Sequence, residues 1–315
     1  MTTYAYLGPQ GTFAEAALRA LPDAAHASWS PYATVSETLE AVRAGVCSTA
    51  VVPLENSVRG VVPATLDELA SGGTGLHIAA EIEIPVTFAL MARPGTTLDE
   101  VRRVRSHPHA HGQCRGWLSA RLPQAQVLLS TSTAGAAREV GESPQPGDAA
   151  IAAPVAAERY GLTVLASGIG ERADAVTRFV ALRSAGPAPA PTGRDRSSFL
   201  LPAEEAGART IAEILGAFSE QGVGPTWVQS WPSGNRLGSY HFFVDIDGHI
   251  EDDDVGEVVM ALHRKGIAAR FLGSYLRAGA GPRARVPAPR RGEEGGLSAE
   301  CWLEALRSGG GVVAA

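Results

Sequence analysis

Short apolar runs alternate with amphipathic segments through the first 185 residues of the chain. The apolar runs, which have the composition of strands covered on both faces of a sheet, lie at 3–8, 48–55, 86–93, 127–130 and 148–152. The segments with helical spacing lie at 9–21, 34–45, 131–142 and 154–161. Because strands that alternate with helices build βαβ units, this order predicts an α/β fold with parallel sheets.

The segment 34–45 also shows where its helix begins and ends. Thr34 or Ser36 is a suitable N-cap, because a short hydroxyl side chain accepts a hydrogen bond from a free N–H of the first turn. Gly45 follows the last apolar position and is a typical stop signal. We therefore expect a helix that starts after one of these hydroxyl residues and ends just before Gly45.

A different pattern follows residue 185. Residues 186–196 (GPAPAPTGRDR) lack apolar periodicity and predict a linker. Residues 197–277 then predict strand, helix, two strands, helix and strand, which is the βαββαβ order of a ferredoxin-like sandwich. Residues 278–315 are rich in Pro, Arg and Gly and predict a partly disordered tail, with a short terminal helix near Ser298.

Composition narrows the class of protein. Hydrophobic residues make up 45% of the 315 positions and charged residues 19%, which is typical of a globular protein. A net charge of −6 without a long basic run argues against nucleic acid as a partner. No apolar stretch has membrane-spanning length and no signal sequence is evident, so no membrane association is expected. Three widely separated cysteines favour reduced thiols and a cytoplasmic location.

The triplet Thr177-Arg178-Phe179 opens an apolar run and places a hydroxyl, a guanidinium and an aromatic ring together. Such a set suits a site that expels a hydroxyl group from a small carboxylate substrate. The hydroxyl can donate a proton to the leaving oxygen, and the arginine can hold a carboxylate with two parallel hydrogen bonds. An isolated triplet of this kind is more often only the start of a strand, so its neighbours in the chain decide the interpretation.

Further motifs connect the triplet to a known family. They are YLGPQGTFAEAA (6–17), VPLENSVRG (52–60), TLDELA (65–70), SHPHAHGQC (106–114), STAGAA (132–137) and TRF (177–179). In this order, the motifs resemble those of prephenate dehydratase, and the resemblance extends to about residue 277. The segment GSYHFFVDIDGHIED (238–252) resembles an ACT domain, a module that binds amino acids. The family converts prephenate to phenylpyruvate with loss of water and carbon dioxide, and the resemblance implies that no metal or cofactor is needed.

The resemblance also implies roles for individual residues. Thr177 would hydrogen-bond or protonate the leaving hydroxyl, and Arg178 would bind a substrate carboxylate or order the site. The other residues implied to be catalytic, all neutral donors, are Asn56, Ser106 and Gln113. The residues implied to contact substrate are Gly11, Thr12, Glu55, Ser57, Gly60, Ser132, Thr133 and Phe179. Of these, Phe179 suits packing better than catalysis, and Glu55 suits fixing a turn better than contacting a dianion.

Several of these residues have a second interpretation that the sequence leaves open. Ser132 and Thr133 lie at a predicted helix start, where they are either anion ligands or simple N-caps. The alternating His107, His109 and His111 lack an acidic or cysteine ligand at suitable spacing, so we expect no metal site.

The predicted effector site departs from the family pattern. The family usually has Gly-Ala-Leu before the first ACT helix and Glu-Ser-Arg-Pro on the second strand. The corresponding residues here are Gly207, Ala208, Gln229, Ser230, Trp231 and Pro232. The loss of one acidic and one basic residue predicts that phenylalanine feedback is weakened, absent or switched to another ligand. In the catalytic part, Asp174 replaces a neutral residue and leaves arogenate, which carries an ammonium group, as an alternative substrate.

The resemblance implies a two-lobed α/β catalytic domain, similar to a periplasmic binding protein, over residues 1–185. The first lobe is expected over 1–77 and 168–184, and the second over 78–167. A homodimer or homotetramer is implied because ACT units commonly pair. A prephenate-analogue dehydratase and a non-catalytic small-molecule sensor remain as alternatives. An enzyme is favoured over a sensor because the chain retains Asn56, Ser106, Gln113, Thr133 and Thr177 together.

Overall fold

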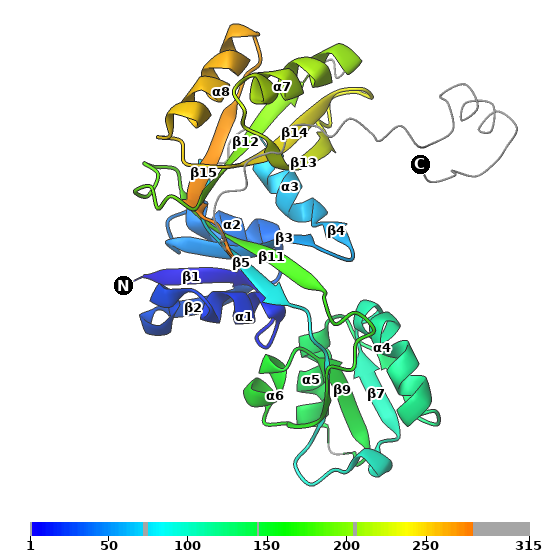
Figure 1. The fold of residues 1–315 in the computed structure, drawn as a ribbon. Coiled ribbons are helices and arrows are strands. Elements are labelled where there is room, and N and C mark those ends of the chain that lie inside the picture. Colours follow the sequence, from blue (N-terminus) through cyan, green and yellow to red (C-terminus); the bar gives the residue numbers. More distant parts are fainter. Residues whose placement is uncertain (1, 72–74, 144, 204–206, 280–315) are drawn as a thin grey trace, which may run out of the picture. The chain divides into compact units, whose positions relative to one another are not determined.

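The structure is a computed structural model that describes residues 2–71, 75–143, 145–203 and 207–279. Within these residues the strands form three sheets, and helices pack against each of them (Figure 1). The predicted terminal helix and almost all of the predicted tail lie outside the described residues.

The first sheet has the strand order β2-β1-β3-β11-β5, with β4 paired to β3. Its strands are β1 (Thr3–Leu7), β2 (Ser28–Tyr32), β3 (Thr49–Asn56), β4 (Gly60–Val61), β5 (Leu76–Pro85) and β11 (Val176–Ser184). Its helices are α1 (Phe13–Arg19), the 3₁₀ helix η1 (Pro22–His26), α2 (Val35–Arg43) and α3 (Pro63–Ala70). The expectation of a parallel sheet is only partly right, because β11 runs antiparallel to both β3 and β5. The chain leaves this sheet at the end of β5 and returns to it through β11. Strand β11 therefore runs in the opposite direction to its neighbours β3 and β5.

Helix α2 matches the sequence prediction at both ends. Its N-cap is Thr34, whose hydroxyl oxygen accepts the N–H of Glu37 at 3.1 Å. Gly45 follows the helix with φ +71°, a conformation that glycine adopts without steric cost. The choice between Thr34 and Ser36 is thereby decided, and Ser36 lies inside the first turn.

The second sheet has the order β10-β6-β9-β7-β8. Its strands are β6 (Ala89–Ala92), β7 (Arg103–Ser106), β8 (Gln126–Leu129), β9 (Asp148–Ala152) and β10 (Thr163–Ser167). Its helices are the 3₁₀ helix η2 (Leu98–Glu100), α4 (Pro108–Arg121), α5 (Thr133–Glu142) and α6 (Val155–Tyr160). The expected lobe boundary at residue 77 is wrong. Strand β5 stays paired with β11 as far as Pro85, so the chain crosses into the second lobe only after that residue.

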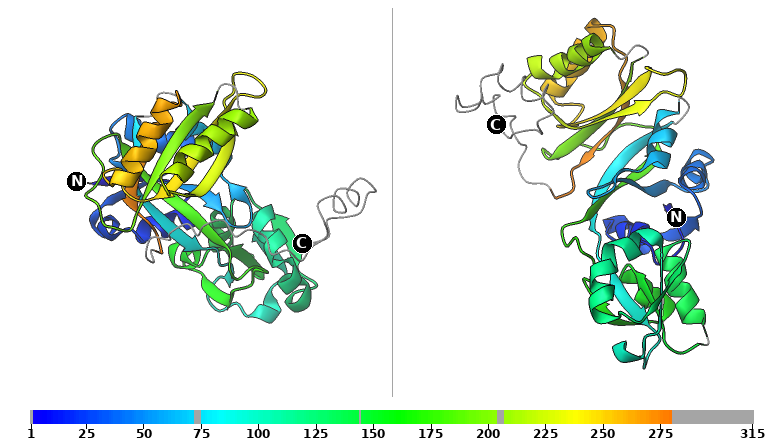
Figure 2. Two further views of the ribbon diagram at one scale, coloured as in Figure 1. Left: turned by 45° about the horizontal axis from the view of Figure 1, so that its top comes forward. Right: turned by 90° about the vertical axis from the view of Figure 1, so that its right-hand side faces the viewer.

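The third sheet has the order β13-β14-β12-β15 and is antiparallel throughout. Its elements are β12 (Asp195–Ala203), α7 (Ala208–Glu220), β13 (Pro225–Pro232), β14 (Tyr240–Asp247), α8 (Asp253–Arg264) and β15 (Arg270–Leu276). This is the predicted βαββαβ order, and α7 and α8 lie together on one face of the sheet (Figure 2). The predicted linker ends early, because Asp195 and Arg196 already belong to β12.

The other face of the third sheet packs against the first sheet. Leu272 and Tyr275 of β15 belong to one buried apolar cluster with Leu66, Leu69 and Ile78 of the first lobe. Burying each such side chain stabilises the fold by about 1.5–3 kcal/mol relative to exposure. The ACT-like unit and the first lobe therefore share a core, rather than being joined only through the linker.

Candidate functional site

The ends of β3 and β11 bring Asn56 and Thr177 together. The two residues lie opposite each other in the antiparallel ladder, and the Asn56 side-chain Nδ2 donates to Thr177 Oγ1 at 2.9 Å. The Asn56 Oδ1 accepts the backbone N–H groups of Val58 at 3.0 Å and Arg59 at 2.9 Å. These two bonds fix which side of the amide carries the oxygen, so the amide N–H₂ group must face Thr177.

This arrangement determines how the Thr177 hydroxyl can act. Its oxygen accepts the Asn56 hydrogen bond, which leaves the hydroxyl hydrogen available for another acceptor. The residue is 8% exposed, so a hydrogen bond to a bound ligand would form in a largely desolvated setting. The pair can therefore donate one proton or hydrogen bond to a leaving oxygen.

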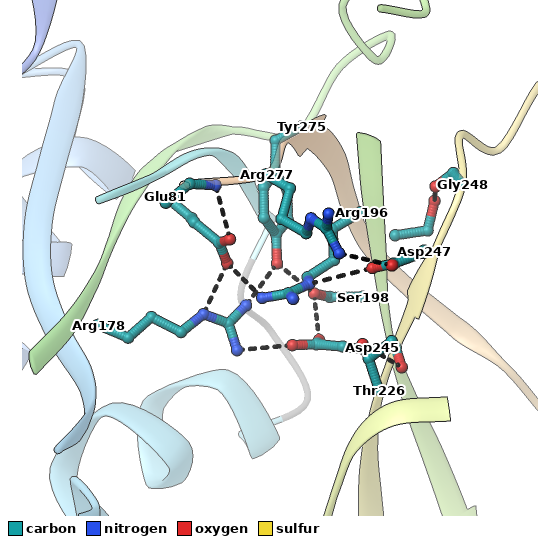
Figure 3. Close-up of polar contacts among 12 residues, drawn as sticks. Glu81, Arg178, Arg196, Ser198, Thr226, Asp245, Asp247, Gly248, Tyr275 and Arg277 are labelled. Atoms are coloured by element: carbon teal, nitrogen blue, oxygen red, sulfur yellow. Dashed lines mark hydrogen bonds and ion pairs between the residues drawn. The ribbon is translucent and has the colours of Figure 1, made fainter. Parts of the chain in front are cut away.

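Arg178 lies on the opposite face of β11, because successive side chains of a strand alternate between faces. The sequence grouped Thr177 and Arg178 in one site, whereas the structure divides them. Figure 3 shows the guanidinium among side chains of β5, β14 and β15. Its Nε lies 2.7 Å from Glu81 Oε2, and its other nitrogens donate to Asp245 Oδ2 at 2.6 Å and to the Tyr275 hydroxyl at 2.9 Å.

The cluster keeps Arg178 charged although the residue is buried. Burial by itself lowers the pKa of the guanidinium, but the nearby Asp245, Tyr275 and Glu81 raise that pKa above its ordinary value. The guanidinium carbon also lies 5.7 Å from the centre of the Trp227 ring. Three of its five N–H groups are engaged in this cluster, which supports the implied role of Arg178 in ordering the site, while its role as a carboxylate ligand stays a prediction.

Sequence reasoning missed Glu81 and Asp245. Their side chains are 0% and 2% exposed, and each has apolar neighbours on both sides in its strand. An acidic residue on the buried face of a strand needs a cationic partner, because an isolated buried charge is strongly unfavourable. This signal was present in the sequence, but strand β5 had not been recognised and the partner was therefore not sought.

The second lobe contributes the residues of the SHPHAHGQC motif. Ser106 ends β7 and is fully buried, and its hydroxyl donates to the carbonyl of Ile151 at 3.1 Å. Gln113 lies on α4 and is half-buried. Burial, then His109 and then Arg59 lower the pKa of His107 below its ordinary value. The influence of Arg59 shows that this motif and the turn after Asn56 lie near each other.

The residues at the helix starts act as caps. The Ser132 hydroxyl accepts the N–H of Gly135 at 2.8 Å, so the N-cap interpretation holds for Ser132, and Thr133 is the first residue of α5. Thr12 caps α1, and the N–H of Gly11 donates to Glu15 Oε2 at 2.6 Å. This carboxylate already occupies the Gly11 N–H, which removes one expected donor of an anion cradle.

The remaining first-lobe candidates are spread around the Asn56 turn. Ser57 exchanges hydrogen bonds with the backbone of Val176, and Gly60 begins β4 with φ +79°. Glu55 faces the side of the sheet on which Arg178 lies, where both line a small pocket with Trp227. Phe179 is 2% exposed within an apolar cluster, in agreement with its interpretation as a packing residue.

The candidate effector residues lie in two places of the third sheet. Gly207 is the N-cap of α7, whose first residue is Ala208. Gln229, Ser230 and Pro232 lie on β13, which is an edge strand. Trp231, in the position where the family usually has arginine, donates from its indole nitrogen to Asp67 of α3 at 2.9 Å. This side chain therefore joins β13 to the first lobe.

Across residues 2–71, 75–143, 145–203 and 207–279, no group of three or more His, Cys, Asp or Glu side chains is arranged to hold a metal ion. In the same part of the chain, no helix is both long and apolar enough to cross a bilayer. The His107 and His109 rings stack with centroids 5.0 Å apart, so their proximity reflects ring packing.

Cys114 is expected to resist alkylation in the folded protein. Burial raises the pKa of its thiol to about 12, with Glu171 adding to the effect, and only the thiolate is an efficient nucleophile. We expect iodoacetamide at pH 8 to leave Cys114 unmodified in the native state and to modify it in denaturant, as read by peptide mass spectrometry. Rapid native-state labelling of this peptide would show that the thiol is accessible.

Fold and site together define a class of protein: a two-lobed α/β protein with an ACT-like sheet and an amide–hydroxyl pair at two strand ends. The family model for prephenate dehydratase matches residues 4–187. Prephenate dehydratase of Mycolicibacterium gilvum is 40% identical over 98% of this chain and 99% of its own length. The chain therefore belongs to the prephenate dehydratase family, enzymes of phenylalanine biosynthesis.

Solved structures agree with this assignment. A crystal structure of prephenate dehydratase from Arthrobacter aurescens, in complex with L-Phe, is 42% identical with a TM-score of 0.83 and covers 98% of this chain and 100% of that one. The enzyme from Staphylococcus aureus is 26% identical with a TM-score of 0.75 and covers 87% of this chain and 100% of that one. The predictions of a two-lobed fold and of a prephenate dehydratase enzyme are thus confirmed.

Proposed function

We propose that Thr177 donates its hydroxyl proton to the departing hydroxyl group of prephenate, and that Asn56 holds Thr177 in the required orientation. The carbon–oxygen bond breaks, the oxygen leaves as water, and the Thr177 oxygen takes up a proton from solvent to restore its hydroxyl. The bond to the ring carboxylate breaks as well, and its electron pair completes the aromatic ring as carbon dioxide is released. The 2.9 Å bond from Asn56 to Thr177 supports this proposal, because it leaves the hydroxyl hydrogen free. Comparing phenylpyruvate formation by Thr177→Val and Thr177→Ser tests it.

We further propose that neutral donors of the second lobe hold the substrate carboxylates. Gln113 in the second turn of α4 and Thr133 at the start of α5 carry hydrogen-bonding side chains, and the first N–H groups of α5 add a favourable field for anions. Thr177, with its free hydroxyl hydrogen, supplies the proton, so substrate binding and proton donation fall to different residues.

Prephenate is favoured over arogenate as the substrate. The arogenate alternative rests on Asp174, which is exposed and lies three residues before Thr177. An exposed carboxylate is screened by water and salt, so it discriminates weakly between a keto group and an ammonium group. A comparison of kcat/KM for the two substrates decides the point, and a strong preference for arogenate would overturn this choice.

We expect phenylalanine to bind weakly to this chain. The relative from Arthrobacter aurescens was crystallised with L-Phe, whereas here Gln229 and Trp231 stand where the family pattern has glutamate and arginine. Trp231 is engaged with Asp67, so the position offers no guanidinium to a bound amino acid. We expect isothermal titration calorimetry with phenylalanine to give a Kd above about 1 mM, where the binding free energy is about −4 kcal/mol. Micromolar binding accompanied by inhibition would contradict the expectation.

A further inference from the structure

We infer that Asp245, a residue of the ACT-like sheet, is a positioning residue for the dehydration, acting on Thr177 through Arg178. This inference rests on the proposed role of Thr177 and adds a residue that lies on the opposite face of β11. The link has two steps. Asp245 Oδ2 holds the Arg178 guanidinium at 2.6 Å, and Arg178 is the chain neighbour of Thr177.

The carboxylate of Asp245 is well suited to this task because both of its oxygens are held (Figure 3). Oδ2 binds Arg178, while Oδ1 accepts the Ser198 hydroxyl at 2.5 Å. The Ser198 oxygen lies 2.6 Å from the Tyr275 hydroxyl, which in turn accepts from Arg178 at 2.9 Å. The four side chains therefore close a ring of hydrogen bonds, in which no member can move without breaking a contact.

The second carboxylate beside Arg178 cannot replace Asp245. The Oε2 atom of Glu81 is shared between Arg178 at 2.7 Å and Arg196 at 2.8 Å, and its Oε1 accepts the N–H of Ala278 at 2.9 Å. Removing the charge of Asp245 would leave Arg178 with Glu81, a carboxylate that it shares with Arg196. Because an uncompensated charge in a desolvated cluster is strongly unfavourable, Arg178 would shift toward water or toward Glu81.

A shift of Arg178 would reach Thr177 because the two residues are adjacent in β11 and the pairing of β11 with β3 is irregular directly beside them. The ladder between β11 and β3 changes register between Arg178 and Phe179, so regular pairing is interrupted directly after Arg178. On its other edge β11 stays paired with β5. Side chains also hold its two faces, with Asn56 on Thr177 and Asp245 on Arg178. Releasing one of these contacts would let the β3 edge of the strand shift and misalign the hydroxyl.

The test compares Asp245→Asn with the matched control Asp247→Asn. Asp247 lies two residues along β14 and is similarly buried, but it contacts Arg196 and Arg277 instead of Arg178. We expect Asp245→Asn to lower kcat for prephenate by roughly 10- to 100-fold with KM nearly unchanged, since a small misplacement of a catalytic group acts on the transition state. The control should keep kcat within about threefold even if its thermal unfolding midpoint falls equally. Equal kcat values for the two variants would overturn the inference.

A double-mutant cycle separates positioning from general stability. Because Asp245 acts through Arg178, the double variant Arg178→Gln/Asp245→Asn should have a kcat no lower than that of the less active single variant. If the two residues acted independently, their losses in kcat would multiply, and that result would refute the link. If Asp245→Asn does not fold, Ser198→Ala keeps the carboxylate and removes only its support, and we then expect a kcat loss of about 3- to 10-fold at unchanged KM. An unchanged kcat in Ser198→Ala would count against the inference.

The proposed function is judged independently. Loss of activity in Thr177→Val together with a normal Asp245→Asn enzyme rejects only the positioning role. Full activity in Thr177→Val rejects the proton donor itself.

Discussion

Replacing Thr177 by valine is expected to lower kcat for prephenate by roughly 10²–10⁴-fold, the usual contribution of a positioned general acid. Valine has nearly the same shape as threonine and fills the same space, so the change removes the hydroxyl with little other disturbance. The residue is 8% exposed and lies in a regular ladder pair with Asn56, which favours retention of the fold. Phenylpyruvate formation, followed by its absorbance under alkaline conditions, measures the effect.

Thr177→Ser is the matched control, because serine keeps a hydroxyl that can accept the Asn56 hydrogen bond. We expect this variant to retain kcat within about tenfold, since only the restriction of side-chain rotation by the methyl group is lost. A Thr177→Val enzyme that keeps more than about a third of wild-type kcat would exclude Thr177 as the donor, because a general acid contributes at least about 10²-fold.

Local signals explain why much of the fold could be predicted. The βαββαβ order followed from apolar periodicity and glycine stops, and the cap at Thr34 followed from a hydroxyl directly before an apolar helical pattern. Strand β5 was not recognised because Glu81 and Glu83 interrupt its apolar residues and resemble a solvated segment. Its buried Glu81 is explained only by arginines more than 90 positions away in the chain, which no local pattern contains.

The sequence motifs predicted which residues lie near the site, but not which face of the sheet each side chain occupies. The pairing of Asn56 with Thr177 agrees with their expected common role, whereas Arg178 was assigned to the same site because it is adjacent in sequence. Adjacent residues of a strand point to opposite faces, so a strand assignment for residues 176–184 would have been enough to separate the two. The partner Asp245 belongs to another sheet, and only the packing of the ACT-like unit on the first lobe reveals it.

That packing depends on Gly273, and Gly273→Ala is expected to weaken it strongly. Gly273 has φ +136°, and a Cβ at this position would lie 2.2 Å from the carbonyl oxygen of Ile78 and 3.0 Å from its nitrogen. These are backbone atoms of β5, which cannot move aside without disturbing its ladder with β11. Overpacking and the unfavourable φ together are expected to lower the free energy of unfolding by about 2–5 kcal/mol.

Gly266→Ala isolates the two causes, because Gly266 also has a positive φ, +75°, but has no atoms within 4 Å of the added Cβ. The control should lose only about 1–2 kcal/mol. Gly273→Ala should in addition lower kcat, since separating β15 from β5 draws Tyr275 away from Arg178. Calorimetric unfolding and phenylpyruvate assays measure both effects.

Equal losses of stability in the two variants would mean that the contact between β15 and β5 is dispensable. A larger loss in Gly273→Ala, with reduced kcat, would mean that docking of the ACT-like sheet supports both the fold and the orientation of Thr177.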